Sequence, residues 1–440
     1  NLLQLIVHKY KVKSESSNMY DLMKELFPLT RSITGNGIRD SLNIINKHIP
    51  LEISEVPTGT QAFDWTVPKE WNIKDAYIED NKGKVIVDYK SNNLHVVSYS
   101  TPVDKIIDLK ELEKHLYSIE DKPDAIPYVT SYYKERWGFC LSDNQRKQLK
   151  EGNYRVFIDS ELKEGSLSYG ELILPGKNEN EIFLSTYLCH PSMANNELSG
   201  PVVLVQLVKW LMSEPRRFTY RIVFSPEIIG SIVYLSKNIK QMKEKIIAGL
   251  NFSCLGVGDE FSFMPSRYGN TLADKVALAT LKYSNFKYIK HSFLERGSDE
   301  RNYCAAGVDL PFVSIMRKKY GHYPEYHTHL DNLNLIKPKI LFESLKMIKD
   351  CVENFENNKL YKCSVIGEPQ LGKRKLYPNS TISSEKTRDE IMDYLNVVSY
   401  SDGSNDLIDL CEILNINPKK LLPIINTLIA NGLLEEYNIL

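Results

Sequence analysis

Residues 189–200 read CHPSMANNELSG and lie between two apolar runs, residues 182–185 and 202–212. The first run has the length of a buried strand and the second that of a helix, so the stretch is predicted to be a polar loop that joins them. His190 and Glu197 give this loop one imidazole and one carboxylate. Open α/β sheets place ligands outside the carboxyl ends of their strands, so the loop is the first candidate for a functional site.

The alternation of short and long apolar segments continues along the chain. We predict strands at 171–174, 182–185, 221–224 and 248–252, and helices at 202–212 and 336–355. Strands separated by helices favour an α/β fold with a mixed, mostly parallel sheet flanked by helices. Residues 17–48 add an opening helical segment.

Two further segments have a different character. Residues 53–165 are rich in aromatic residues and turn signals, with strand-like runs at 84–89 and 95–99, and we expect an inserted β-rich domain there. The basic stretch 359–377 is interpreted as a linker. Residues 378–440 follow with helical patterns and then Asn-Gly-Leu-Leu before a strand, which predicts a winged-helix domain. The three expected helices are 384–395, 407–414 and 418–431.

Composition narrows the class of protein. The chain has 440 residues and a net charge of −1, which leaves no overall field to attract nucleic acid or an anionic membrane. The apolar runs are far shorter than the ~20 residues of a membrane helix, and the apolar start at 2–7 is too short for a signal peptide. Seven cysteines without a CxxC pair indicate reduced thiols, so we expect a cytoplasmic protein. The chain does not begin with Met, and we expect its first residues to be missing.

The C-terminal segment 378–440 has four basic and ten acidic residues, a net charge of −6. A module of this charge lacks the electrostatic footprint for phosphates, so a nucleic-acid partner is unlikely despite the winged helix. We expect it to contact proteins instead, as a homo-oligomer or with another partner. A DNA-binding regulator is the alternative that this charge disfavours.

Glu227 follows the 221–224 strand between Pro226 and two isoleucines. Apolar surroundings raise the pKa of a carboxyl group and suit it to proton transfer. The structural alternative is that Glu227 caps a helix that begins near Gly230.

Two more clusters could carry chemistry. Residues 296–301 read RGSDER, and the interpretation without a function is a surface turn whose two acidic and two basic residues neutralise one another. Residues 323–332 read YPEYHTHLDN, in which His327 and His329 would share one face of a strand, as metal ligands do. Such matches are frequent by chance.

The order of these four motifs along the chain resembles that in the zinc aminopeptidase family. Its members carry a His, an Asp-Asn-x-Ser-Gly loop, a Glu-Glu pair, a further Asp and a late His-Thr. The resemblance covers roughly 17–50 and 166–355. It implies a zinc exopeptidase-like domain formed by residues 1–52 and 166–358, in a bacterial branch with an inserted β domain and a C-terminal winged helix. The stretches that look characteristic of this branch are 63–68 (FDWTVP), 189–200, 296–301 and 326–331.

The sequence departs from the family pattern at positions that bind the metal ions. Asn196 stands at the position of the metal-bridging Asp, Ser253 at that of another Asp ligand, and Ile228 replaces the second Glu. Asparagine and serine are weak zinc ligands, so a two-zinc site is not expected. The resemblance then implies a single zinc held by His190 and His327 with Glu197 as third ligand, and His329 as a further candidate.

The resemblance also implies roles for other residues. Glu227 would be the general base of an aminopeptidase that cleaves an N-terminal residue from a peptide or another amide. Substrate binding is expected from Asp299, Glu300 or Asp331, which could pair with a free α-amino group. Oxyanion stabilisation is expected from Tyr326 or from one of Arg296, Arg301 and Arg317.

Two other interpretations of the chemistry stay open. The missing carboxylates also fit a catalytically degenerate protein that binds a ligand or metal and acts through protein–protein contacts. Cys189 could be a reactive thiol, but nothing in the sequence gives it a separate partner set, so we expect a small core residue.

Overall fold

The computed structural model describes residues 2–377 and 385–437, with side chains from residue 14 and, after the gap, from 389. The chain divides into two compact units, one formed by 1–274 and 286–348 and the other by 275–285 and 349–440. The position of Ser384, where the first C-terminal helix was expected to begin, lies outside the described residues.

The first unit is built on an eight-stranded sheet in the order β1-β10-β12-β11-β13-β16-β14-β15. β12, β11, β13 and β16 are mutually parallel, whereas β1, β10 and β14 introduce antiparallel pairs. This confirms the mixed, mostly parallel sheet. The strands are β1 (Glu52–Pro57), β10 (Ser166–Leu174), β11 (Glu181–Tyr187), β12 (Thr219–Ser225), β13 (Ile246–Phe252), β14 (Phe261–Met264), β15 (Tyr288–Lys290) and β16 (Phe312–Met316).

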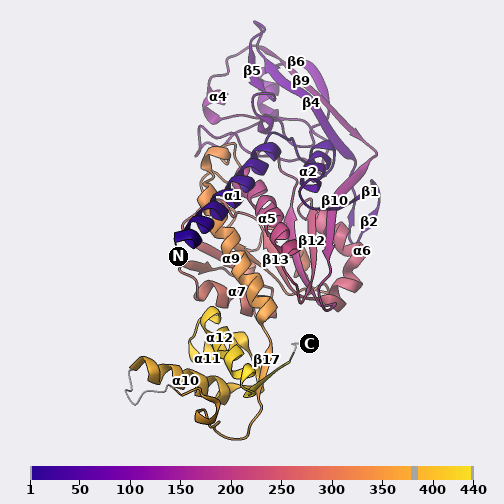
Figure 1. The fold of residues 1–440 in the computed structure, drawn as a ribbon. Coiled ribbons are helices and arrows are strands. Elements are labelled where there is room, and N and C mark those ends of the chain that lie inside the picture. The colour runs from indigo at the N-terminus through magenta and orange to yellow at the C-terminus, as the bar shows by residue number, and fades with distance from the viewer. Residues whose placement is uncertain (1, 378–384, 438–440) are drawn as a thin grey trace. The chain divides into compact units, whose positions relative to one another are not determined.

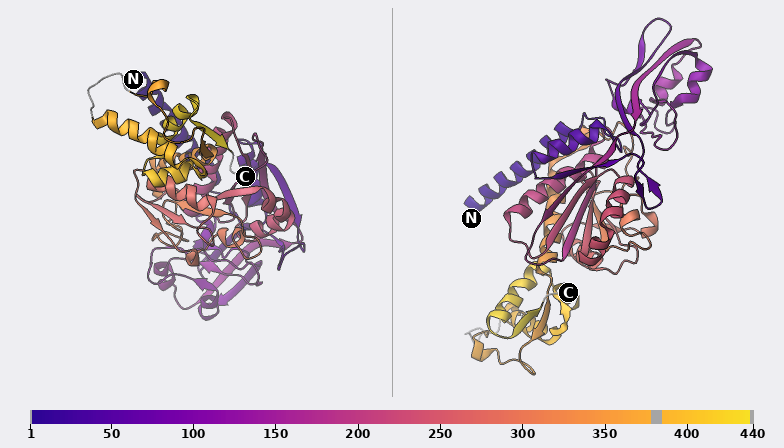
Figure 2. Two further views of the ribbon diagram at one scale, coloured as in Figure 1. Left: turned by 90° about the horizontal axis from the view of Figure 1, so that it is seen from below. Right: turned by 90° about the vertical axis from the view of Figure 1, so that its right-hand side faces the viewer.

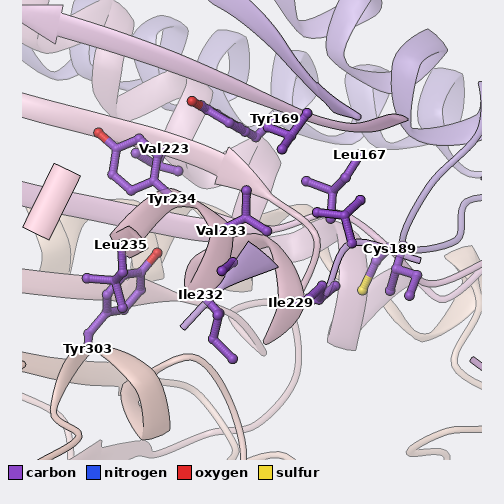
Figure 3. Close-up of a cluster of buried hydrophobic side chains, with 14 of the residues drawn as sticks. Leu167, Tyr169, Cys189, Val223, Ile229, Ile232, Val233, Tyr234, Leu235 and Tyr303 are labelled. Atoms are coloured by element: carbon purple, nitrogen blue, oxygen red, sulfur yellow. The ribbon is translucent and has the colours of Figure 1, made fainter. Parts of the chain in front are cut away.

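Helices cover both faces of this sheet (Figures 1 and 2). All seven residues of β11 are buried, which explains why its apolar residues 182–184 follow one another without alternation. One face, with Phe183 and Val223, packs against the helix after β12 in a large apolar cluster (Figure 3). The helices of this unit, two of which extend into the second, are α1 (Leu2–Leu26), α2 (Asn36–Asn46), α5 (Ser199–Ser213), α6 (Ile229–Lys245), α7 (Leu272–Lys282), α8 (Glu300–Tyr303) and α9 (Pro338–Asn357).

The inserted segment has a core of its own around a four-stranded sheet in the order β5-β4-β9-β6. A strand was expected at residues 95–99, but His95 ends a short 3-10 turn and Val96 and Ser98 make only isolated bridges, so that prediction was wrong. The remaining elements before β10 are β2 (Gln61–Ala62), β3 (Trp65–Thr66), β4 (Glu70–Glu79), β5 (Val85–Asp88), β6 (Val103–Asp108), α3 (Leu109–Leu112), β7 (Leu116–Tyr117), β8 (Phe139–Cys140), α4 (Asp143–Lys147) and β9 (Asn153–Lys163).

The second unit contains the C-terminal helices and a three-stranded sheet in the order β18-β17-β19. The central strand, β17 (Leu360–Cys363), lies in the stretch interpreted as a linker, so that interpretation was wrong for these residues. The other elements are α10 (Glu385–Tyr400), β18 (Asp402–Asp406), α11 (Leu407–Leu414), α12 (Pro418–Ala430) and β19 (Leu434–Tyr437).

Helix α11 begins where the sequence predicts, because Asp406 and Asp409 form a reciprocal capping box at its start. None of the helices in the described ranges is both long enough and apolar enough to cross a bilayer.

Candidate active site

His190 and Glu227 meet at the carboxyl edge of the parallel strands. β11 and β12 are neighbours that end in register at Tyr187 and Ser225, so the loops after them leave the sheet side by side. His190 Nε2 lies 3.7 Å from Glu227 Oε2. Ile228, with φ of 64°, caps α6 without any side-chain hydrogen bond, so the alternative of Glu227 as the helix cap is wrong.

Glu197 lies behind the ring of His190. Its Oε2 is 2.7 Å from His190 Nδ1, and its Oε1 accepts a 2.6 Å hydrogen bond from the backbone N–H of Cys189. The guanidinium of Arg31, which is fully buried, lies 3.3 Å from the same oxygen. Both oxygens of Glu197 are therefore engaged, and the ring of His190 is fixed with Nε2 toward Glu227. A carboxylate on the far nitrogen of a histidine is the usual support of a metal ligand.

His327 presents a second imidazole next to the first. The ring centroids of His190 and His327 are 5.4 Å apart, and Tyr326 stacks on His327 at 3.9 Å. Burial and the neighbouring His190 lower the pKa of His327 to about 3, so the ring is neutral, which is the form that binds metals. His327 has a positive φ of 53°, a strained conformation that needs support from its surroundings.

Residues 126–128 supply that support. The backbone N–H of Tyr128 donates to the carbonyl of His327 at 2.9 Å, and that of His329 donates to Ile126 at 3.0 Å. The N–H of Ile126 donates in turn to His329 Nδ1 at 2.9 Å, so this ring nitrogen is engaged by the backbone.

Tyr128 also covers the two imidazoles. Its ring centroid lies 5.0 Å from that of His190 and 5.3 Å from that of His327. Its hydroxyl is 2.6 Å from that of Tyr132. Sequence reasoning missed both tyrosines, although the run YVTSYY at 128–133 was a visible aromatic signal.

The 296–301 cluster is not a surface turn. Ser298, Asp299 and Glu300 are buried, while Arg296 and Arg301 are exposed. The hydroxyl of Ser298, which sequence reasoning also missed, donates to Glu227 Oε1 at 2.8 Å. The acids of this segment therefore face the protein interior and the arginines face solvent.

Asp299 and Glu300 bind backbone and side-chain donors. Asp299 accepts hydrogen bonds from the N–H of Ile228 at 2.7 Å and the hydroxyl of Ser231 at 2.8 Å. Glu300 accepts from two backbone N–H groups of its own turn and from the hydroxyl of Tyr320. Burial, with Glu227 nearby, raises the pKa of Asp299 to about 8. Burial also raises the pKa of Glu227, as its apolar flanks predict.

Two other sequence candidates bind groups other than the imidazoles. Asp331 accepts from the N–H groups of Asn195 and Asn196 at 2.6 and 2.9 Å, and so caps the start of the helical segment before α5. Arg317 is buried and donates to the carbonyl of Gly258.

One group of side chains in the described residues has the spacing of a metal site, and His327 is not part of it. Cys189 Sγ, a ring nitrogen of His190 and a Glu227 oxygen lie within 4.8 Å of one another. Two ligands about 2.0–2.2 Å from one zinc lie roughly 3.3–3.8 Å apart, and the His190–Glu227 distance falls in that range. At the second position Asn196 Oδ1 is bound to the hydroxyl of Tyr187 at 2.7 Å, and no carboxylate replaces it among the described residues.

Burial raises the pKa of the Cys189 thiol to about 11. It packs in the apolar cluster near Ile229 and Leu167 (Figure 3).

The chain has a peptidase-like α/β fold, with a His after one parallel strand and a Glu after the next at the carboxyl edge of the sheet. The chain belongs to the family described as a domain of unknown function (DUF4910), whose model matches residues 20–358. A winged helix-turn-helix model matches residues 359–436.

Relatives from Clostridium acetobutylicum resemble nearly the whole chain. A protein named for polysaccharide biosynthesis with an aminopeptidase-like domain is 44% identical over 411 residues, 92% of this chain and 93% of its own. A crystal structure of a candidate peptidase from the same organism is 40% identical, with a TM-score of 0.91 over 99% of this chain and 100% of its own.

A more distant likeness concerns the fold alone. The zinc aminopeptidase BSAP from Bacillus subtilis is 13% identical, with a TM-score of 0.57 over 77% of this chain and 94% of its own.

Proposed function

We propose that the chain is a hydrolase that uses a single zinc ion to cleave an amide bond. The observation that carries the proposal is the orientation of His190. Glu197 holds Nδ1 at 2.7 Å, and the free Nε2 faces Glu227 beside the neutral ring of His327. The peptidase-like fold and the aminopeptidase-like domain of the Clostridium relative support the same reaction type.

His190 and His327 would hold the ion, and Glu197 would act through His190 by fixing its ring and tautomer. Zinc bound there lowers the pKa of water and polarises a carbonyl. Glu227 takes the proton of the attacking water and delivers it to the leaving nitrogen. The hydroxyl of Ser298 keeps the Glu227 carboxylate in place from its other oxygen.

A second candidate function, binding without turnover, is favoured by one observation. With Glu197 behind His190, the carboxylate that faces the imidazoles is Glu227. If Glu227 is the third zinc ligand rather than the base, the site binds metal and lacks a proton acceptor.

The variant Glu227→Gln separates the two functions. A hydrolase keeps its zinc and loses turnover of an amide substrate by about 10²–10⁴-fold, as expected for a general base. A binding site loses its zinc. His48→Ala serves as the control, because His48 pairs with Lys209 and takes no part in the site. Full activity in Glu227→Gln would contradict the role of this residue.

A further inference from the structure

We propose that a pocket next to strands β14 and β15 binds a small molecule in which a phosphoryl group is attached to an apolar body. The inference concerns a second site of the molecule and does not depend on the zinc hydrolase. Three observations carry it: a cavity of the size of a small-molecule site, two cations without a carboxylate partner, and an apolar wall that is exposed to solvent.

The pocket is a surface cavity of about 550 Å³, within the range of roughly 300–1,000 Å³ that small-molecule sites have. Residues of two segments line it, 265–269 after β14 and 290–296 at the end of β15. The two strands are parallel neighbours in which Phe263 pairs with Lys290, so the chain leaves both side by side. Because β14 runs antiparallel to β16, these segments leave the strands in the direction opposite to the loops that carry His190 and Glu227.

The charged side chains that line the cavity are cationic. Arg267, Lys290 and Arg296 belong to the lining, and none of the described lining residues is an acid. The nearby carboxylate of Asp309 contacts Arg267. Within the described part of the chain, neither Lys290 nor Arg296 forms an ion pair.

A second carboxylate near the cavity, that of Glu295, has partners of its own. One oxygen accepts the backbone N–H of Ser292 at 3.1 Å, and the other lies 3.5 Å from Nδ1 of His291. One ammonium and one guanidinium group are therefore left for a ligand, and both residues are exposed.

These two cations match a phosphoryl group. A phosphate monoester carries a charge of about −1.5 to −2 at pH 7 and three acceptor oxygens. Guanidinium binds such oxygens through two parallel N–H groups, and an ammonium group adds a compact charge. A carboxylate has a single charge and would neutralise only one of the two.

The guanidinium groups are held in place before a ligand arrives. Arg267 lies over the ring of Tyr268 at 4.7 Å, and Arg296 lies over that of Phe293 at 5.0 Å. Arg296 Nη1 also donates to the carbonyl of Phe293 at 3.3 Å. A side chain that is already ordered loses less conformational entropy when it binds, so the remaining N–H groups of Arg296 are suited to an anion.

The wall beside these cations is apolar. Tyr268 is 76% exposed and Leu294 is 84% exposed, and both line the cavity together with Phe293. Single exposed apolar side chains are ordinary, but a group of them at a cavity marks a binding site. Inorganic phosphate would leave this wall uncovered, so the ligand is expected to have an apolar part next to its phosphoryl group.

The test is isothermal titration calorimetry on the full chain with phenyl phosphate, inorganic phosphate and benzoate. We expect phenyl phosphate to bind with one molecule per chain, and the other two probes to bind about tenfold more weakly. Inorganic phosphate lacks the apolar body, and benzoate has one charge fewer. Binding of phenyl phosphate should weaken as NaCl is raised, because the site is open to solvent and its charges are screened.

Variants of the exposed lining residues separate the two parts of the ligand. Arg296→Gln and Lys290→Gln should each raise the Kd for phenyl phosphate about tenfold, because each removes a charge-assisted hydrogen bond. Tyr268→Ala should raise it about fivefold and leave the Kd for inorganic phosphate unchanged. The matched control is Arg155→Gln, at another exposed arginine that lies over an aromatic ring, which should change neither value. Circular dichroism checks that each variant is folded.

Absence of phenyl phosphate binding, or an unchanged Kd in Arg296→Gln, would overturn the proposal. Benzoate that binds as tightly as phenyl phosphate would overturn the phosphoryl group, and inorganic phosphate that does so would overturn the apolar body. His190→Ala should bind phenyl phosphate like the wild type. Loss of binding in that variant would place the anion at the imidazoles and contradict a separate pocket. None of these results bears on the hydrolase, which Glu227→Gln tests.

Discussion

The substitution Glu197→Gln tests how the site is assembled. The carboxylate of Glu197 receives the N–H of Cys189, faces His190 Nδ1 and lies beside the guanidinium of Arg31, all in a fully buried position. The amide that replaces it has nearly the same shape but carries no charge. If its NH₂ group faces His190, it donates to Nδ1 and moves the ring proton to Nε2, where it blocks the metal.

The expected magnitude follows from these contacts. Loss of a supporting carboxylate usually weakens metal binding by about 10–100-fold, and the change of tautomer puts Glu197→Gln at the upper end. Arg31 also loses its buried counter-charge, so the free energy of unfolding should fall by about 3–5 kcal/mol.

Zinc affinity would be measured by competition with a chromophoric chelator, and stability by urea unfolding. Glu161→Gln, which alters an exposed glutamate, is the matched control and should change neither value. Unchanged zinc affinity in folded Glu197→Gln would refute the support of His190 by Glu197. Zinc lost without any loss of stability would point to Glu197 as a ligand instead.

Three further predictions concern single side chains. His329→Ala should keep its zinc and lose about 1–2 kcal/mol of stability, because Ile126 holds the ring through Nδ1; zinc content that falls with this variant would show that His329 is a ligand. Arg31→Ala should lower the free energy of unfolding by about 3–5 kcal/mol in urea unfolding, whereas Lys24→Ala, at an exposed ion pair, should change it far less; equal costs would contradict the buried pair. Burial raises the pKa of Asp331 to about 6, so its contribution to the free energy of unfolding is full below about pH 4 and is lost as the pH rises through 6. The free energy of unfolding of Asp331→Asn should therefore vary less between pH 4 and 6 than that of the wild type. Identical slopes of this free energy against pH would be evidence against the shift.

The parts of the fold that the sequence predicted are those whose signals are local. β11 and β12 each contain a short continuous apolar run, and helix α11 starts at a capping box. His190 and Glu227 were found because they follow such strands directly, and neighbouring parallel strands deliver their loops to one edge.

The parts that the sequence missed depend on contacts between distant residues. The position of Glu197 behind His190 is set by the π-helical turn Ala194–Leu198 and by Arg31, more than 150 residues earlier. Tyr128 reaches His327 from the inserted segment, and no spacing along the chain links them. β17 is a strand of four residues that includes Lys362, and its character comes from pairing with β18 and β19.

The net charge of the C-terminal module, which was used as an argument against a nucleic-acid partner, depends on where the module begins. Over residues 359–436, which the winged helix-turn-helix model matches, the sequence has nine basic and eleven acidic residues, a net charge of −2. The charge therefore disfavours a phosphate partner less than residues 378–440 alone indicate.

Zinc content of the purified protein tests the central claim most directly. Elemental analysis would compare the wild type with His190→Ala, His327→Ala and His48→Ala after zinc is supplied and the excess removed. The account predicts about one zinc per chain in the wild type and in His48→Ala, and loss of zinc in the other two. Absence of zinc from the wild type, or one zinc retained in both His190→Ala and His327→Ala, would contradict it.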